Sequence, residues 1–418
     1  MIRGTGGVTR PSLTIRMETD GTLPGHHHVS LTVRRTQPTS TAAGKRATSP
    51  GFPLPLYGVL IFAGIRLLDL AVAAFLLPRG RFRRLHCSLQ TLTRTWDAGR
   101  YLFIAIHGYP HDSNIIWYPG YPAAIRAVTW MPGISLVRAG LAVTIAAGLA
   151  AAWGLTRLSM TLTGDRRISL LITAPWAAAP ASIVLSMLYP EALFCALAIW
   201  SLIALVERRW LTAAGLTILA GTVHSTAMAL VAAVTAAALT ELVRAARAQQ
   251  SIATLRRPAA AVLLAPLGLL SYWGYVALAV HRLDGWFLLE GKVGNGFDWG
   301  HSTMLALKNA IINGPTAYAA LTLLVLAAAA ALAAFSLTER MPVCLHAYTL
   351  VIVLTAIGTG PYYLGSKPRF LLPAMLLGLP LTRLLAPARI WLLIPLIATL
   401  AAASTWFSLY LMSVGWAP

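Results

Sequence analysis

The chain has 418 residues, of which 57% are hydrophobic and only 11% are charged. A soluble domain carries about 25% charged residues, so this composition excludes a water-soluble fold. Lys and Arg outnumber Asp and Glu by 33 to 13, but most basic residues lie in an N-terminal tail and in short connections, where membrane topology explains them without nucleic-acid binding.

The N-terminal residues 1–50 are expected to form a disordered basic tail on the cytoplasmic side. They are rich in Thr, Ser, Arg, Gly and Pro and contain no apolar run that would offset chain entropy. The triple histidine at 26–28 is interpreted as incidental rather than as a metal site. The first apolar segment begins near Leu54, and we expect a retained signal anchor there instead of a cleaved signal peptide. Residues 51–418 then form a single membrane domain.

Apolar segments of about twenty residues recur after this tail, with short polar breaks between them. In lipid such segments can only be helices, because their backbone polar groups must bond internally. The sequence therefore predicts an all-α polytopic membrane protein with about eleven transmembrane helices. We place them at 54–77, 134–157, 168–187, 190–206, 210–223, 226–242, 259–280, 316–335, 342–361, 369–386 and 389–412.

The basic residues of the connections predict the orientation of these helices. With the tail inside, every predicted cytoplasmic connection carries Arg, as the positive-inside rule requires. The outer face receives a long first loop at 78–133, turns at 189–191 and His224, a loop at 281–315 and residues 361–369. In the alternative topology the basic run 79–84 lies inside and residues 115–131 span the membrane.

The acidic residues gather on the predicted outer face. The chain has only 13 carboxylates, and six of them are expected there: Asp97, Asp112, Glu191, Asp284, Glu290 and Asp298. Asp69 is different, because it lies one helical turn after Arg66 inside the first span, where the two residues are interpreted as a structural pair. The one-sided distribution predicts an external site built from several loops.

The long first loop contains the most informative sequence. It reads TWDAGRYLFIAIHGY at 95–109 and WYPGYPAAIR at 117–126. Asp97 thus lies among aromatic residues at the membrane surface, where rings can stack on a sugar and the acid can accept a hydroxyl proton. The alternative is an aromatic belt at the interface with a solvated Asp97. Spacing alone leaves both interpretations open.

Four sequence blocks resemble the bacterial relatives of PIG-V, mannosyltransferases of the GT-C superfamily. Residues 96–109 resemble the motif W-D-x-x-x-Y-x-x-I-A-x-x-G-Y, 117–126 resemble F-F-P-L-Y-P-x-x-x-R, 186–194 resemble a Y-S/T-E-S/A-L-F turn, and 369–373 resemble R-F-x-L-P. The chain departs from the family at Gly120 and Pro190, where Leu and a small hydroxyl residue are usual. It also has His224 in a turn that usually contains Arg.

The resemblance implies a GT-C-like bundle and an inverting transfer of a hexose, with mannose as the expected sugar. The donor would be a polyprenyl-phosphate sugar, and the acceptor a lipid, a glycan or a protein on the extracytoplasmic face. Asp97 matches the loop acid of the family and would be the catalytic base. The substrate-binding candidates are Trp96, Arg100, Tyr101, His107, Tyr118, Tyr121, Arg126, Glu191, His224, Lys367 and Arg369.

Several of these candidates have a second interpretation. Arg100, Lys367 and Arg369 are expected to hold the departing phosphate, but Lys367 and Arg369 also suit snorkelling at a helix end. Loop histidines such as His107 and His224 often only satisfy neighbouring groups. The aromatic and acidic segment 284–300 is either a lid over the acceptor or an interfacial loop.

No metal or cofactor is expected besides the lipid-linked sugar itself. The three cysteines, at 87, 195 and 344, have no ligand spacing, and no nucleotide-binding fingerprint is present. The expected partners are the polyprenyl-phosphate sugar, the acceptor and membrane lipids, without nucleic acid. We expect a multi-pass protein of the cell membrane whose active site faces the extracytoplasmic side.

Two competing functions stay open at the level of sequence. The first is a transporter or lipid flippase, which the number of spans and the intramembrane residues Arg66 and Asp69 suggest. The second is a non-catalytic membrane scaffold, which the presence of His224 in place of Arg suggests.

Overall fold

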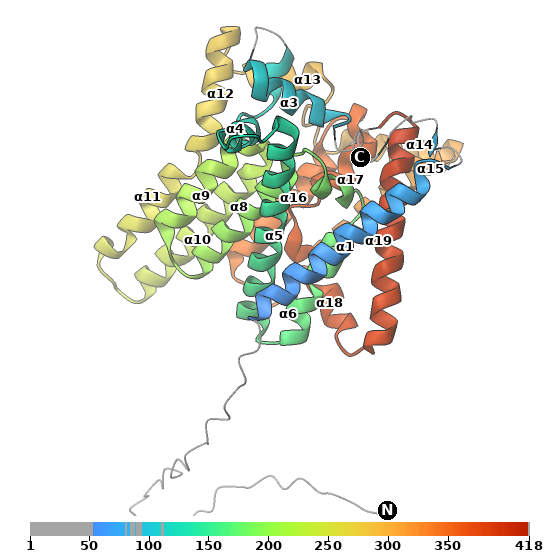
Figure 1. Cartoon of the computed structure of the whole chain (residues 1–418). Helices are drawn as coiled ribbons and strands as arrows, with labels where there is room; N and C mark the ends of the chain where they lie inside the picture. The colour runs from blue at the N-terminus through green and yellow to red at the C-terminus, as the bar shows by residue number, and fades with distance from the viewer. Residues whose placement is uncertain (1–52, 80–81, 84–87, 89–93, 110–112, 417–418) are drawn as a thin grey trace, which may run out of the picture. The chain divides into compact units, whose positions relative to one another are not determined.

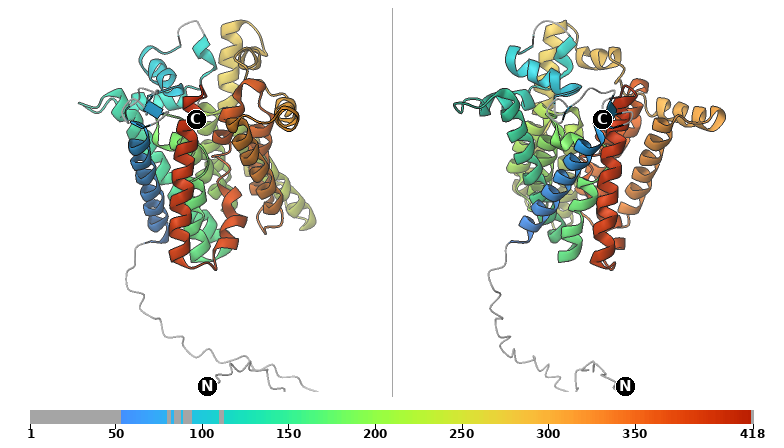
Figure 2. Two further views of the ribbon diagram at one scale, coloured as in Figure 1. Left: turned by 90° about the vertical axis from the view of Figure 1, so that its right-hand side faces the viewer. Right: turned by 45° about the vertical axis from the view of Figure 1, so that its right-hand side comes forward.

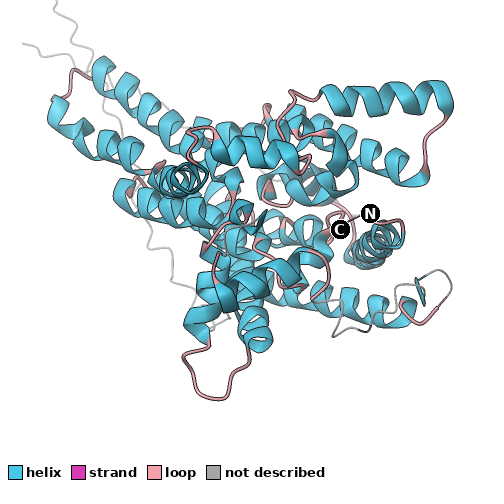
Figure 3. Cartoon of the chain, turned by 90° about the horizontal axis from the view of Figure 1, so that it is seen from above, coloured by secondary structure: helices cyan, strands magenta, loops and turns pink. Residues whose placement is uncertain are grey.

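The computed structural model describes residues 53–416, except for 80–81, 84–87, 89–93 and 110–112. Within these residues the regular structure is helical, apart from an isolated antiparallel bridge between Phe297 and Thr359 (Figure 3). The prediction of an all-α polytopic membrane protein is confirmed. The predicted tail with its three histidines and the outer-face residue Asp112 lie outside the described residues.

Six helical segments of the described chain are long and apolar enough to cross a membrane. They are α1 (Leu54–Leu76), α5 (Leu136–Thr163), Ser225–Arg247 with α10 (Met228–Arg247), Ile252–Val280 with α11 (Arg256–Leu264) and α12 (Leu267–Val280), α15 (Ala317–Ser336) and α19 (Ile390–Ser413). Two further helices, Leu364–Phe370 and Met375–Leu385, form a pair that is bent by 82°. If this pair counts as one membrane span, the described chain has up to seven. The apolar helices α8 (Glu191–Val206), α9 (Trp210–Val223) and α16 (Val343–Gly358) are shorter.

The number of full-length helices is therefore smaller than the predicted eleven, and proline explains part of the difference. The predicted span 168–187 is divided into α6 (Arg166–Leu171), α7 (Thr173–Ala177) and a 3-10 turn, η3 (Ser182–Ser186). Pro175 and Pro180 lie in this segment, and proline has no backbone N–H to continue a helix. The bent pair occupies most of the predicted span 369–386, and it contains Pro368 and Pro380, with Pro373 in the break between its two helices.

The remaining elements are short helices and turns between the long ones. They are α3 (Asp97–His107), η2 (Ser113–Ile116), α4 (Gly120–Val128), η4 (Ser225–Ala227), η5 (Ile252–Leu255), α13 (Gly285–Lys292), α14 (His301–Asn313), η6 (Pro361–Ser366), α17 (Lys367–Phe370), η7 (Met375–Gly378) and α18 (Leu379–Leu385). The nine residues of α4 rise only about 14 Å at 1.5 Å per residue. This is too short to cross a bilayer, so residues 115–131 do not form the span that the alternative topology requires.

The two ends of the bundle differ in chemistry. Figure 1 shows α3, α4 and α13 at the end of the bundle where α12 ends, and α6 and α18 at the other end. At this second end Glu207 pairs with Arg157 and Arg209, with N–O distances of 2.5 and 2.8 Å. Glu241 pairs with Arg208 and with Arg244. These ion pairs join connections that the sequence assigned to one side of the membrane.

The ionisable pair inside α1 is part of the helix packing. Figure 2 shows α1 and α19 side by side, and Arg66 and Asp69 lie buried on α1. Arg66 pairs with Asp69 and donates to Ser182 of η3, while Thr405 of α19 donates to Asp69 at 2.9 Å. A buried charge needs such partners, and these bonds connect α1 with η3 and α19. The pair therefore fits the structural interpretation.

Candidate active site

Asp97 begins helix α3 at a tightly constrained position. The preceding residue, Trp96, has a φ of 59°, which is uncommon for an aromatic residue. The backbone N–H of Asp97 donates to the phenol oxygen of Tyr189 at 3.3 Å. A carboxylate is favoured in the first turn of a helix, where the backbone N–H groups carry partial positive charge. The strained backbone of Trp96 precedes Asp97, and the start of the helix and the hydrogen bond to Tyr189 fix the position of the Asp97 backbone.

Arg369 joins two acidic residues from distant parts of the chain. Its Nη1 lies 2.7 Å from Oδ2 of Asp97, and its Nε lies 3.5 Å from Oε1 of Glu191. The guanidinium carbon also lies 5.3 Å from the ring centroids of both Tyr189 and Phe370. Arg369 and Glu191 are buried. Two carboxylates from two sequence blocks thus share the guanidinium of a third block.

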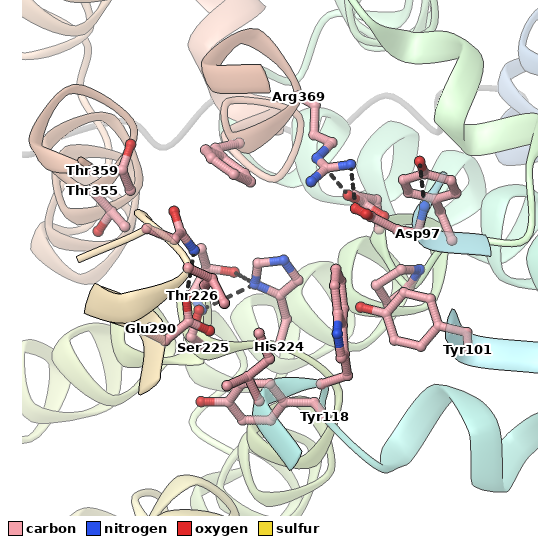
Figure 4. Close-up of a pocket in the computed structure, with 18 residues that line it drawn as sticks. Asp97, Tyr101, Tyr118, His224, Ser225, Thr226, Glu290, Thr355, Thr359 and Arg369 are labelled. Carbon is pink, nitrogen blue, oxygen red and sulfur yellow. Dashed lines mark hydrogen bonds and ion pairs between the residues drawn. The ribbon is translucent and has the colours of Figure 1, made fainter. Parts of the chain in front are cut away.

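These residues line one pocket together with groups from α13 and α16. Figure 4 shows His224 between the pair formed by Asp97 and Arg369 on one side and Thr226 and Glu290 on the other. The lining residues are Asp97, Tyr101, Ile116, Trp117, Tyr118, Tyr189, Pro190, Glu191, His224, Ser225, Thr226, Glu290, Val293, Asn295, Thr355, Thr359, Arg369 and Phe370. All four sequence blocks contribute, so residues separated by more than 250 positions meet at one site.

The hydrogen bonds of His224 define which ring nitrogen carries its proton. The backbone N–H of Thr226 donates to Nδ1 of His224 at 3.2 Å. Because a backbone N–H can only donate, Nδ1 is an acceptor and the proton of the neutral ring is on Nε2. Burial and the charge of Arg369 lower the pKa of His224 to about 4. His224 is therefore a neutral N–H donor in the pocket at neutral pH.

Aromatic rings form the side of the pocket next to Asp97. Tyr101 packs edge-on against Trp117 and Tyr121, with ring centroids 5.4 and 5.5 Å apart. The hydroxyl of Tyr118 accepts a hydrogen bond from Trp273 of α12 at 2.9 Å. Burial raises the pKa of Tyr101 and of Tyr118, so both remain phenols. This wall offers flat faces and hydroxyl groups, which suit a sugar.

The opposite wall carries the third carboxyl group of the pocket. Glu290 of α13 lines the pocket, and Nδ2 of Asn295 donates to its Oε2 at 2.8 Å. Burial raises the pKa of Glu290 to about 7. Among the described residues that line the pocket, Arg369 is the one permanently charged cation. The wall that carries Glu290 therefore has no cation of its own.

Lys367 is not among the residues that line the pocket. Its ammonium is completely buried and donates to Thr303 at 2.6 Å and to the carbonyls of Thr359 and Ile357 at 2.7 and 3.1 Å. These three bonds use the donors of an ammonium group. Lys367 therefore joins α14, α16 and α17, and we do not assign it to the phosphate.

Five other predicted residues also lie outside the pocket lining. Trp96, Arg100, His107 and Arg126 are exposed, and His107 contacts the carbonyl of Phe103 at 3.2 Å. Tyr121 is buried behind Tyr101, where its hydroxyl contacts Thr144 at 2.8 Å. The structure thus brings together six of the twelve predicted residues: Asp97, Tyr101, Tyr118, Glu191, His224 and Arg369.

Sequence reasoning did not select the residues of the far wall. Glu290 was counted among the outer-face acids, but Asn295 and Thr226 gave no separate signal because polar loop residues are common. Tyr189 lay inside a recognised block and was not selected either. The acid distribution was the signal that could have identified Glu290, since Asp97, Glu191 and Glu290 are the described outer acids in the pocket.

Comparison with known proteins shows which sequences resemble this chain. A family model described as mannosyltransferase (PIG-V) matches residues 83–324, which include three of the four blocks. GPI mannosyltransferase pigv-1 of Caenorhabditis elegans is 29% identical over 115 residues, 24% of this chain and 17% of that protein. GPI alpha-1,6-mannosyltransferase 2 is 32% identical over 130 residues in Cricetulus griseus, covering 29% of this chain and 26% of the relative. The human protein of that name is 31% identical over 122 residues, covering 27% and 24%.

The matched segments thus span 17% to 26% of the length of these curated relatives. The family model, in contrast, covers more than half of this chain. The family resemblance inferred from the sequence blocks is therefore confirmed, and the chain belongs to the PIG-V family of mannosyltransferases.

Proposed function

We propose that this protein transfers a hexose, with mannose as the family indicates, from a polyprenyl-phosphate donor to an acceptor on the extracytoplasmic face. The observation that carries the proposal is the carboxylate of Asp97, held by Arg369 beside aromatic rings in a pocket built from all four sequence blocks. A positioned base and a nearby cation are the groups that such a transfer requires.

The reaction is an inverting displacement at the anomeric carbon. The acceptor oxygen attacks this carbon and gives its proton to Asp97, while the bond from the carbon to the phosphate oxygen breaks and the phosphate keeps the electron pair. We assign the proton to Oδ1, because Oδ2 is held by Arg369. Arg369 also has the charge that stabilises the departing phosphate.

Two features support a lipid-linked donor. The helices that end or begin at the pocket, α8 and α9, have 16 and 14 residues, about 21–24 Å at 1.5 Å per residue. A bilayer core is about 30 Å thick, so a pocket at these helix ends suits a substrate embedded in the membrane. The wall of an apolar cavity of about 350 Å³ also contains Pro368 and Leu371, which lie on either side of Arg369 in the sequence. This cavity offers room for part of a lipid chain.

The names of the relatives and the position of the basic connections support the acceptor class and the side of the membrane. The relatives are named GPI alpha-1,6-mannosyltransferase 2, which favours a lipid-linked glycan as acceptor and an α-1,6 linkage. The basic connections lie at the opposite end of α8 from Glu191, since Glu207 directly follows this helix. By the positive-inside rule, this arrangement supports a pocket on the extracytoplasmic side.

The test is a transfer assay with purified protein in lipid nanodiscs. Labelled mannose is supplied either on a short isoprenyl phosphate or as a nucleotide sugar, with a membrane glycolipid extract as acceptor. We expect labelled glycolipid from the isoprenyl-phosphate donor and none from the nucleotide sugar. The isoprenyl-phosphate donor should give the same product when a chelator is present. Product from the nucleotide sugar would contradict the donor class, loss of product on chelation would contradict the metal-free mechanism, and no product from either donor would contradict the activity.

A further inference from the structure

The far wall of the pocket contains Glu290 and Asn295, which the proposed reaction does not use. We propose that these two side chains form a subsite that binds the hydroxyl groups of the hexose in the pocket. The inference rests on the proposed function and adds to it the groups that recognise the sugar, whether donor or acceptor.

The geometry of this wall is fixed by the chain itself. The backbone N–H of Asn295 donates to the backbone carbonyl of Glu290, and its side-chain Nδ2 donates to Oε2 of the same residue, both at 2.8 Å. Gly294, with a φ of 84°, makes the turn that brings them together. A side chain held by such bonds presents its remaining polar atoms without further ordering.

The polar atoms of this wall are not all satisfied by the protein. Oδ1 of Asn295 is enclosed and has no hydrogen-bond partner among the described residues, and neither has Oε2 of Glu191 in the same pocket. An enclosed polar atom without a partner loses free energy that a bound polar ligand restores. The unsatisfied oxygens thus indicate a ligand rich in hydrogen-bond donors.

Hexose hydroxyl groups match this requirement, because each can donate and accept. A carboxyl group next to a carboxamide presents both acceptors and a donor, and the raised pKa of Glu290, about 7 because of burial, keeps part of the molecules protonated near neutrality. Figure 4 shows His224 between this wall and Arg369, and its Nε2–H is a further neutral donor in the pocket.

Charge separates this subsite from the place of the phosphate. Arg369 is the one permanent cation among the described lining residues, and it lies across the pocket from Glu290 (Figure 4). An acidic wall without a cation disfavours a phosphate. The phosphate therefore belongs near Arg369, and a sugar bound at Glu290 lies across the pocket from it.

The experiment measures binding, so that it does not depend on turnover. The probes are isoprenyl-phosphate mannose, isoprenyl phosphate without a sugar, and octyl mannoside as a stand-in for an acceptor sugar. We expect Glu290→Ala to weaken one of the two mannose-bearing probes by about tenfold, as for a lost hydrogen bond, and to leave isoprenyl phosphate within about twofold. The affected probe identifies the sugar as that of the donor or of the acceptor.

Two further variants distinguish recognition from a structural role. Glu290→Gln keeps the shape and a donor and is expected to bind like the natural protein, whereas Asn295→Ala should weaken the same probe as Glu290→Ala. Asp284→Asn is the matched control, because Asp284 directly precedes the same helix but pairs with Arg282 outside the pocket.

Several results would overturn the inference. One is unchanged binding of both mannose-bearing probes in Glu290→Ala. Another is equal weakening of isoprenyl phosphate, and a third is a natural protein that binds mannose-bearing probes no better than isoprenyl phosphate. Failure of the transfer assay with normal probe binding would instead contradict the proposed function alone.

Discussion

At the scale of single residues, the site depends on how one guanidinium serves two carboxylates. Arg369 contacts Asp97 and Glu191 through different nitrogens of its planar group, and this rigid fork sets the direction of Asp97. The family usually has an Arg in the turn where this chain has His224. Since His224 is neutral here, the positive charge near the two carboxylates comes from Arg369.

Replacing Arg369 with Lys tests this dependence. Lys keeps the charge but has no planar fork, so it cannot bridge both acids at the observed distances. We expect kcat/KM for sugar transfer to fall by roughly 10²-fold, because displacing a catalytic group by about 1 Å can cause a loss of this size. The transfer assay measures it, with thermal unfolding as a check of the fold. Full activity of Arg369→Lys would show that the bridge does not position Asp97.

Sequence reasoning found five pocket residues that lie in the recognised blocks, but it missed Tyr189 of the same blocks. The five are Asp97, Tyr101, Tyr118, Glu191 and Arg369. Sequence reasoning could not distinguish Lys367 from Arg369, because two positions on one short helix face different neighbours and only packing decides which one enters a pocket. Glu290 has no motif around it. Glu290 lies about 100 residues or more from Asp97 and Glu191 in the sequence, and only the fold of the chain brings α13 to the pocket.

At the scale of helices, close packing around α9 positions the turn that carries His224. Gly221 of α9 and Gly268 of α12 allow the two backbones to approach. A Cβ on Gly268 would lie 1.9 Å from the carbonyl oxygen of Ile218, which belongs to the backbone and cannot move alone. Because α9 ends at the pocket, its separation from α12 also sets the position of the following turn.

Gly268→Ala is therefore expected to destabilise the protein, by the 1–3 kcal/mol that overpacking typically costs, as a rough estimate. The matched control is Gly274→Ala on the same helix, since a Cβ there meets nothing within 4 Å. Thermal unfolding of the purified variants should give a lower transition temperature for Gly268→Ala and an unchanged or higher one for Gly274→Ala. Equal transition temperatures would refute this account of the α9 and α12 contact.

The sequence predicted the helices with long apolar runs, such as α1, α5 and α19, because hydropathy and length define them. It did not predict where helices break. The segment 168–187 is apolar enough for a span, but its prolines and the positive φ of Ala181 divide it. Such a break satisfies its backbone through tertiary contacts, which no local pattern reveals.

At the scale of the whole membrane domain, acids of the site and basic connections lie at opposite ends of the same helices. Glu191 begins α8 and Glu207 follows it, so the pocket and the ion-pair cluster are separated by the length of that helix. Asp284 and Ser251 are separated in the same way, because α11 and α12 run between them.

Cysteine labelling of intact cells can test this orientation. In a Cys87→Ser background, where the native Cys195 and Cys344 are buried, we expect a membrane-impermeant maleimide to label Asp284→Cys and not Ser251→Cys. Both positions are exposed. After permeabilisation both should react. Labelling of Ser251→Cys alone in intact cells would reverse the topology and put the pocket in the cytoplasm.

The central claim is that Asp97 accepts the proton of the acceptor hydroxyl, and Asp97→Asn tests it most directly. Asn has nearly the same shape and can still contact Arg369, but it is not a base. A general base contributes about 10²–10⁴-fold, so we expect kcat for sugar transfer to fall by at least about 10²-fold, while the KM for isoprenyl-phosphate mannose changes little. An Asp97→Asn protein that transfers mannose at the natural rate would contradict the account.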